Sequence, residues 1–232
     1  MKIAILSDIH GNIRALDAVL SILPKDITKL WILGDLVGYY YNSKEVLETL
    51  ESYDCEYISG NHEILLKDCL YSSKCLDQYT KRYGSSLKRG KEELSDLQIN
   101  FLTTLPHSKT VSIGNRRYFL GHGSPWDLDH YIYPNVDETD LNRFLSFPED
   151  IFFLGHTHYP MHLNYKGKRI INPGSVGQPR NRKQGAHWAI FNTHDESITF
   201  KVTPYPIESL LLEIEEIDPN NEYLKTVLLR TL

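Results

Sequence analysis

The sequence predicts an α/β fold in which two β-sheets pack together and helices flank them. In about its first sixty residues, short apolar runs alternate with amphipathic segments, a pattern typical of parallel strands connected by helices. After residue 106, apolar runs are joined by short turns such as Gly114-Asn115, which indicates antiparallel hairpins. The 232 residues, 41% of them hydrophobic, can bury an ordinary core, so we expect a single domain over residues 1–232.

The N-terminal part of the chain is expected to contain three strands and two helices. Apolar runs predict strands at residues 3–6, 30–33 and 55–59. Asn12 is placed to cap a helix that runs to about Leu23, and Pro24 would end it. A second helix is expected to start at Ser43. This order of elements favours a parallel sheet with helices on its faces.

The remaining elements are helical segments and hairpins. Residues 63–105 are expected to form a helical insertion with breaks at Gly84 and Gly90. Hairpins are expected at residues 109–120, 161–171 and 187–202. Their strands, with one more that follows a short helix over about residues 138–147, would form a second, mostly antiparallel sheet. A leucine-rich helical tail over about residues 207–232 is expected to pack on the core.

Composition narrows the function classes. The net charge of -5 argues against a protein that holds long nucleic acid on a basic surface, but a small anionic substrate remains compatible with it. The three cysteines lack zinc-type spacing, and the apolar run at the N-terminus is too short to span a membrane. We therefore expect a cytoplasmic protein with free thiols and no membrane partner.

Five apolar runs end in a side chain that can bind a metal or transfer a proton. They end at Asp8-Ile9-His10, Gly34-Asp35, Asn61-His62, Gly121-His122 and Gly155-His156-Thr157-His158. If the strands share one sheet, their carboxyl ends would gather these side chains in one crevice. Asp8 and His10 are two residues apart, so in an extended segment both point to one side, and the His156 and His158 pair repeats this geometry. Either pair alone would be weak support for a metal site.

Together these motifs predict a site for two metal ions. The seven candidate donors are Asp8, His10, Asp35, Asn61, His122, His156 and His158. One bridging carboxylate would give each of two ions four protein ligands, and Asp35 is the natural bridge because a carboxylate has two oxygens. Neutral imidazole with oxygen ligands and no thiolate suits divalent manganese, our first expectation, or iron, zinc, cobalt or nickel.

The ordered set of motifs resembles the calcineurin-like metallophosphoesterases. Three stretches are similar to the small bacterial and archaeal phosphodiesterase branch: residues 8–12, 34–39 and 172–180. The resemblance covers roughly residues 1–203. It implies a four-layer α/β/β/α sandwich of two mixed sheets, with helices outside and a dinuclear metal centre.

The resemblance also implies roles for single residues. One ion would be held by Asp8, His10, Asp35 and His158, and the other by Asp35, Asn61, His122 and His156. His62 would not bind metal, but would protonate the leaving oxygen or stabilise charge in the transition state. Many family members have a second carboxylate in the pattern GDxxD that orients this histidine, whereas this chain has Gly38. The orientation of His62 is therefore left open.

The expected function is hydrolysis of a phosphodiester or a nucleotide-type phosphoester. Two divalent ions carry more positive charge than Asp8 and Asp35 offset, so the site would favour phosphate oxygens. Ions about 3.5–4 Å apart can share a hydroxide, which attacks phosphorus in line. Tyr39 could stack a nucleobase or form a wall of the site. Arg180, with nearby basic residues, could hold a second phosphate or lie in solvent. Both functional interpretations together favour a small nucleotide with several phosphates.

Three other functions are compatible with the same sequence. A phosphoprotein phosphatase acting on Ser, Thr or Tyr esters shares the fold and the chemistry. A non-catalytic scaffold on this fold would resemble the retromer subunit of the family. Such a scaffold would be expected to lack metal ligands or the catalytic histidine, and neither is missing here. A nuclease on polymeric nucleic acid is disfavoured by the net acidity.

Overall fold

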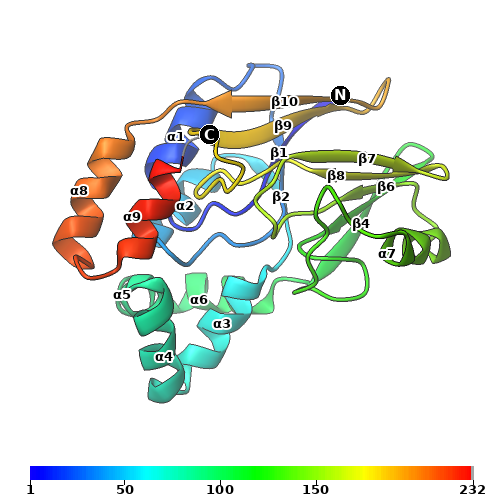
Figure 1. Ribbon diagram of the computed structural model, residues 1–232. Coiled ribbons are helices and arrows are strands. Elements are labelled where there is room, and N and C mark those ends of the chain that lie inside the picture. The colour runs from blue at the N-terminus through cyan, green and yellow to red at the C-terminus, as the bar shows by residue number, and fades with distance from the viewer. Residues whose placement is uncertain (231–232) are drawn as a thin grey trace.

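Two five-stranded β-sheets pack face to face at the centre of the protein (Figure 1), a computed structural model that describes residues 1–230. The first sheet contains, in spatial order, β10 (Ser197–Thr203), β9 (Ala186–Asn192), β1 (Lys2–Leu6), β2 (Lys29–Ile32) and β3 (Asp54–Tyr57). The second contains β4 (Ser108–Ile113), β5 (Arg116–Gly121), β6 (Ile151–Phe153), β8 (Lys168–Asn172) and β7 (Met161–Tyr165). Each sheet has three neighbouring parallel strands, so both sheets are mixed.

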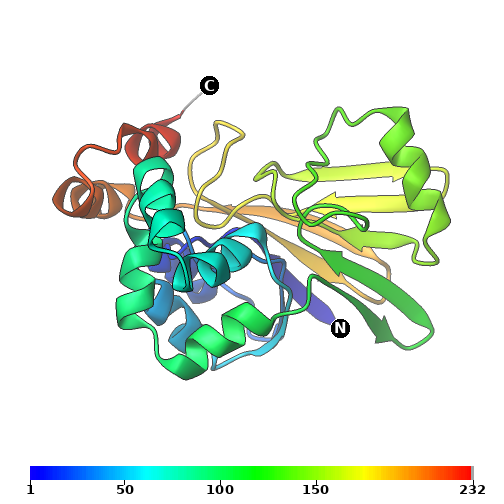
Figure 2. The same ribbon diagram turned by 90° about the horizontal axis from the view of Figure 1, so that it is seen from below.

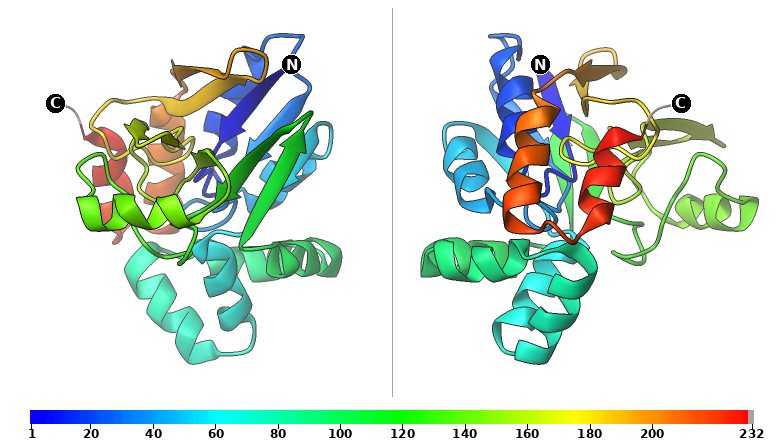
Figure 3. Two further views of the ribbon diagram at one scale, coloured as in Figure 1. Left: turned by 90° about the vertical axis from the view of Figure 1, so that its right-hand side faces the viewer. Right: turned by 60° about the vertical axis from the view of Figure 1, so that its left-hand side comes forward.

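Nine α-helices surround the sheets in the part of the chain that the structure describes. They are α1 (Ile13–Ser21), α2 (Ser43–Leu50), α3 (Asn61–Leu70), α4 (Ser73–Tyr83), α5 (Ser86–Glu93), α6 (Asp96–Thr104), α7 (Glu138–Arg143), α8 (Ile207–Ile217) and α9 (Glu222–Leu229). Figure 2 shows α3 to α6 grouped together, while Figure 3 shows α8 beside α1. Within residues 1–230, no helix combines the length and the apolar character needed to cross a membrane.

Alternation along the strands produces the layers. In β1, Ile3 and Ile5 point into the core between the two sheets, whereas Ala4 and Leu6 point toward the helices on the outer face. Phe152 of β6 faces away from the first sheet, into a third apolar cluster beneath α7. Three apolar clusters thus separate four layers, and the predicted α/β/β/α sandwich is confirmed.

Two expectations about the sheets were wrong. The second sheet is not mostly antiparallel, because β6 pairs parallel with both β5 and β8. The hairpin of β9 and β10 joins the first sheet rather than the second, because β9 pairs antiparallel with β1, with Ala4 opposite Ile190. β1 is buried on both faces and pairs with β2 on one edge only, so its other edge needs a partner for its backbone groups. Ala189 and Phe191 then enter the core between the sheets. The pattern within a hairpin does not reveal which distant edge it will cover.

Helix ends agree with the sequence at some positions and differ at others. α1 ends at Ser21, two residues before the expected Leu23. Asn12 caps α1 as predicted, its side chain accepting a hydrogen bond from the Ala15 amide at 3.1 Å. Gly84 follows α4 with a positive φ of 88° and ends it as predicted. Gly90, in contrast, is buried inside α5, so it is not a break. α3 begins at Asn61, two residues earlier than the predicted insertion, which places Asn61 on a helical turn.

The C-terminal helices are fastened to the rest of the chain at Asp218. Leu210 and Ile214 of α8 are fully buried, which agrees with the expected packing on the core. Beyond α8, one carboxylate oxygen of Asp218 accepts hydrogen bonds from the Tyr41 hydroxyl at 3.0 Å and from the Ser85 amide at 2.7 Å and hydroxyl at 3.0 Å. This contact joins the tail to the start of α5. The organisation as one domain with a helical insertion and a helical tail stays a prediction.

Replacing Asp218 by alanine should lower the free energy of unfolding by about 1–3 kcal/mol, because it leaves three half-buried donors without their shared charged acceptor. Urea denaturation followed by circular dichroism would measure this. Glu216→Ala, an exposed carboxylate on α8, is the matched control. Equal unfolding midpoints for the two variants would show that the Asp218 contacts do not hold the tail.

Candidate metal centre

The seven predicted donors lie together where the carboxyl ends of both sheets meet. Asp8, His10 and Asp35 follow strands of the first sheet, and Asn61 lies on the first turn of α3. The other three histidines follow β5 and β6 of the second sheet. The donors therefore come from both sheets, which direct their strand ends to the same crevice. All the donors are buried except Asn61, which is half-buried.

Four of the donors form a first cluster able to hold a metal ion. Asp8, His10, Asp35 and His158 each offer one ligand atom, and these atoms lie within 4.8 Å of one another. The Nε2 atom of His158 is 3.2 Å from Oδ1 of Asp8 and 3.2 Å from Nε2 of His10. His10 Nε2 is 3.7 Å from Oδ2 of Asp35.

A second cluster shares Asp35 with the first. Asp35, His122 and His156 also offer atoms within 4.8 Å of one another. His122 Nε2 lies 3.2 Å from Asp35 Oδ2 and 3.1 Å from the Asn61 side-chain oxygen, which brings Asn61 into this cluster. His156 Nε2 faces a residue that the sequence analysis missed, Asp129, with its backbone oxygen at 3.2 Å and its carboxylate at 3.3 Å.

Only one oxygen of Asp35 faces both clusters. Oδ1 accepts a hydrogen bond from the His62 amide at 2.8 Å, whereas Oδ2 faces the imidazoles of His10 and His122. Oδ2 is thus the oxygen of Asp35 that both clusters share. The predicted bridging residue fits this geometry, but for a different reason.

Backbone carbonyls determine which ring nitrogen of three candidate ligands is free. The Nδ1 atoms of His10, His122 and His158 lie 3.1, 2.7 and 2.6 Å from the carbonyl oxygens of Val37, Leu33 and Gln178. Since a carbonyl only accepts, each Nδ1 carries the hydrogen. In the neutral rings Nε2 then presents a lone pair to the site.

This arrangement fits a cation. The two Nε2 atoms of His10 and His158, each with a lone pair, face each other at 3.2 Å. Oδ1 of Asp8 is fully buried and has no hydrogen-bond donor among the described residues. A buried carboxylate oxygen without a donor is costly unless positive charge is supplied. The donor set therefore suits a divalent ion with nitrogen and oxygen ligands.

The loops that carry the donors have an unusual backbone. Five of the seven donors have φ between 53° and 66°: Asp8, His10, Asp35, His156 and His158. This left-handed conformation is unfavourable for residues with a side chain and often marks functional sites. Glu63 restrains one of these loops, because its buried carboxylate accepts hydrogen bonds from the amides of Asp35, Leu36, Val37 and Gly60 at 2.7–3.2 Å.

Charge within the cluster is unbalanced. Burial lowers the pKa of His122, but Asp35 and Asp8 act more strongly and raise it to about 10, so this ring is protonated at neutral pH. Burial lowers the pKa of His156 to about 3 and that of His62 to about 4, which keeps both neutral. Two carboxylates and one imidazolium leave at least one negative charge without a partner among the seven donors.

The two predicted substrate residues lie next to the clusters. Tyr39 is 4% exposed, and its ring packs edge-on against His10 with centroids 4.6 Å apart. Its faces are therefore not free to stack a nucleobase, and it forms a wall. Arg180 donates a hydrogen bond from Nη2 to the Tyr39 hydroxyl at 3.1 Å, and its charge helps to lower the pKa of His158 after the larger effect of burial.

A cavity of about 610 Å³ opens beside Arg180. Its lining residues are Tyr133, Pro134, Asn135, Tyr159, Arg180 and Arg230. Tyr133 stacks on Tyr131, which in turn stacks on His156 with ring centroids 3.9 Å apart, so a row of aromatic rings connects the cavity with the second cluster. Tyr131 and Tyr133 are partly exposed, unlike Tyr39.

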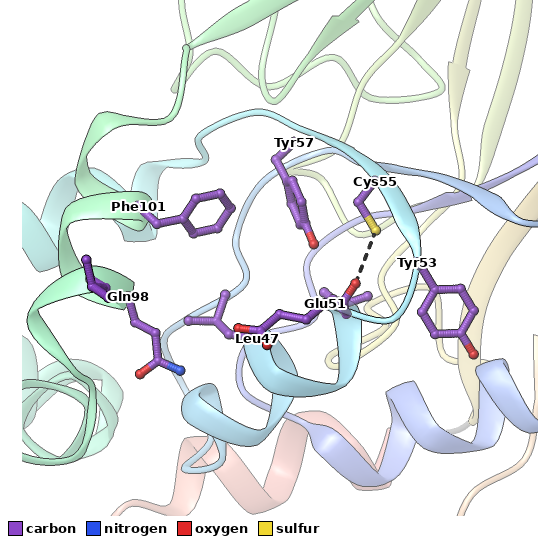
Figure 4. Close-up of a pocket in the computed structure, with 9 residues that line it drawn as sticks. Leu47, Glu51, Tyr53, Cys55, Tyr57, Gln98 and Phe101 are labelled. Carbon is purple, nitrogen blue, oxygen red and sulfur yellow. Dashed lines mark hydrogen bonds between the residues drawn. The ribbon is translucent and has the colours of Figure 1, made fainter.

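A second hollow lies away from the donors. It has a volume of about 380 Å³ and is lined by side chains of α2, β3 and α6, including Leu47, Tyr57 and Phe101 (Figure 4). Cys55 also lines it, and its thiol contacts the Leu50 carbonyl at 3.8 Å. None of the candidate metal ligands borders this hollow.

The comparisons with known proteins agree with this geometry. The family model of the calcineurin-like phosphoesterase superfamily domain matches residues 1–196. The chain belongs to the calcineurin-like phosphoesterase superfamily. A metallophosphoesterase from Sphaerobacter thermophilus, known from its crystal structure, is 28% identical, covers 100% of both chains and superposes with a TM-score of 0.81.

Two further relatives extend the comparison. An uncharacterised protein of Methanocaldococcus jannaschii is 31% identical over 227 residues, covering 89% of this chain and 88% of its own. A hypothetical protein from Pyrococcus horikoshii OT3 covers 97% of both chains with a TM-score of 0.85, and at 23% identity it supports the fold alone. Calcineurin-like phosphoesterases depend on metal, and membership in the family indicates hydrolysis of phosphoesters.

Metal binding to this chain should release about one proton at pH 7, because an ion must displace the proton on His122. Since the pKa of His122 lies near 10, the apparent affinity of the second cluster should rise by up to about tenfold per pH unit from pH 6 to 8. Isothermal titration calorimetry in two buffers of different ionisation enthalpy would count the protons. His62→Ala should release as many protons as wild type does. A metal affinity that decreases as the pH rises from 6 to 8 would contradict the role of His122.

Proposed function

We propose that this chain hydrolyses small phosphodiesters or nucleotide-type phosphoesters with the help of two divalent ions. The observation that supports this most is the pair of buried clusters with Asp35 in common. A single structural metal would need only one of them. Manganese is our first choice of ion, with iron, zinc, cobalt or nickel as alternatives, because the donors are imidazole and carboxylate without thiolate.

The residues divide between the two ions as follows. Asp8, His10, Asp35 and His158 would hold the first ion, and Asp35, Asn61, His122 and His156 would hold the second. Bound there, the ions would supply positive charge for phosphate oxygens and a water of lowered pKa as the nucleophile. Nε2 of His156 faces only acceptors on Asp129, so in the neutral ring it carries the hydrogen, and Nδ1 is the nitrogen left to bind an ion.

His62 is the proposed acid-base or charge-stabilising residue. Its backbone amide is bound to Asp35, and its ring lies edge-on to His10 with centroids 4.8 Å apart, so it borders the clusters without belonging to them. The ring is buried among Tyr39, Tyr79 and Tyr83, which limits its motion. In that position it would present a hydrogen to the phosphate or to the leaving oxygen.

The cavity beside Arg180 supports a small substrate. Its volume of about 610 Å³ is typical of small-molecule sites, and its lining combines aromatic rings with two guanidinium groups. Such a lining suits a nucleotide that carries more than one phosphate, with Tyr133 and Tyr159 in the role first expected of Tyr39. A phosphoprotein phosphatase and a non-catalytic scaffold remain the alternatives.

His62→Ala should keep the metal content of wild type but lower kcat about 10²- to 10⁴-fold, the usual contribution of a general acid. Manganese-loaded protein would be tested on bis(p-nitrophenyl) phosphate, p-nitrophenyl phosphate, a dinucleoside polyphosphate and a phosphopeptide. We expect wild type to act best on the diester and the nucleotide. Preference for the phosphopeptide would favour a protein phosphatase, and no turnover with two bound ions would favour a scaffold.

Arg180→Ala should lower kcat/KM for the dinucleoside polyphosphate about 10- to 100-fold, since it removes charge-assisted hydrogen bonds worth about 1.5–3 kcal/mol. The effect on bis(p-nitrophenyl) phosphate should be smaller, because that substrate has a single phosphate. Arg182→Ala, which removes the same charge from an exposed site two residues away, is the control. Equal losses on both substrates would rule out a specific second-phosphate contact.

A further inference from the structure

The ring of His62 has a hydrogen-bonding partner that the sequence pattern does not reveal. Its Nδ1 atom lies 3.0 Å from the hydroxyl of Tyr79. Tyr79 is 4% exposed and projects from α4, within the helical insertion between β3 and β4. The group that contacts the proposed catalytic histidine thus comes from a segment to which the motifs assigned no chemistry.

The structure leaves no room for the carboxylate that orients this histidine in many family members. That position is Gly38, with φ of 92°. A Cβ atom added to Gly38 would lie 2.1 Å from Nδ1 of His62 and 2.8 Å from the Tyr79 hydroxyl. Any side chain at residue 38 would therefore displace the contact between His62 and Tyr79. The glycine and the tyrosine act as one unit, in which the hydroxyl lies where a carboxylate would approach.

The direction of the hydrogen bond follows from the donors around Tyr79. The backbone amide of Tyr39 donates to the Tyr79 hydroxyl at 3.3 Å, so the oxygen already accepts one hydrogen bond. Its own hydrogen is then available to Nδ1 of His62. His10 and His158 are arranged in the opposite way, because carbonyl oxygens hold their hydrogen on Nδ1 and leave Nε2 bare.

We propose that Tyr79 is a positioning residue that keeps the hydrogen of His62 on Nε2, the nitrogen remote from Tyr79. The inference rests on the proposed role of His62. In the neutral ring, Tyr79 donates to Nδ1 and Nε2–H is the remaining donor. In the charged ring, Nδ1–H donates to the phenol oxygen and Nε2–H is unchanged. A hydroxyl can serve both states, so Nε2–H stays a hydrogen-bond donor in each of them without a carboxylate beside the ring.

Tyr79→Phe isolates this contact, because it removes one oxygen and keeps the ring. Tyr83→Phe is the matched control, since Tyr83 packs against His62 with ring centroids 5.7 Å apart but shows no hydrogen bond to it within the described residues. Both variants should fold, but Tyr79→Phe should melt at a lower temperature than Tyr83→Phe, because the Tyr39 amide and Nδ1 of His62 lose their partner. His62→Gln identifies the His62 signals in the spectra.

The first readout is the tautomer, measured by long-range ¹H–¹⁵N NMR on histidine-labelled protein, metal-free and zinc-loaded. We expect His62 of wild type to be bare at Nδ1 and protonated at Nε2, and Tyr79→Phe to shift its Nδ1 resonance to that of a nitrogen without a hydrogen bond. Tyr83→Phe should leave both resonances in place. A hydrogen on Nδ1 of neutral His62 in wild type would overturn the proposal, whether or not His62 proves essential for turnover.

The second readout is leaving-group dependence in manganese-loaded enzyme. A diester with an alkyl leaving group develops more charge on its oxygen than one with p-nitrophenolate, so it depends more on the Nε2 donor. Tyr79→Phe should lower kcat about five- to tenfold for the alkyl ester, the effect of one hydrogen bond, and less than about twofold for the p-nitrophenyl ester, with KM unchanged. Equal losses on both esters, or no more loss than in Tyr83→Phe, would overturn the positioning role.

Discussion

Two buried carboxylates, Asp8 and Asp35, impose the constraint on which the rest of the structure depends. Both lie at the ends of central strands, where water does not reach them, and an unpaired buried charge is strongly unfavourable. The described residues provide one partial answer, the protonated ring of His122. The remaining negative charge, together with the donors around it, makes these residues able to hold a cation.

Holding those carboxylates in place requires a rigid frame. The left-handed backbone at five donors is tolerated because each loop is fixed at both ends by a buried strand or a hydrogen-bonded turn. Glu63 makes the strongest such contact, since one side chain closes the first turn of α3 and binds the loop of Asp35. Gly60 permits this close approach, because a Cβ atom there would lie 2.2 Å from Asp35 Oδ1.

Much of the fold could be predicted because its signals are local. Strand ends, hairpin turns and the Asn12 cap are written in neighbouring residues, and the ordered donors carried the metal-site hypothesis. The membership of β9 and β10 in the first sheet depends on an edge about 185 residues away, which no local pattern specifies. Asp129 and Tyr79 were missed for the same reason, as each reaches the site from a segment without a motif. The capping role of Glu63 could have been predicted, because a glutamate three residues after the N-cap is typical of a helix start. Its hydrogen bonds to the loop of Asp35 could not be predicted from the sequence.

The contact at Asp218 ties the C-terminal helices to the machinery of the site. Asp218 binds Ser85, which lies between α4 and α5, and α4 carries the tyrosine that faces His62. Through Asp218, α8 and α9 therefore support the insertion as well as the sandwich. A substitution in α8 or α9 can then change the position of His62, more than 100 residues earlier in the chain, without contacting a candidate metal ligand.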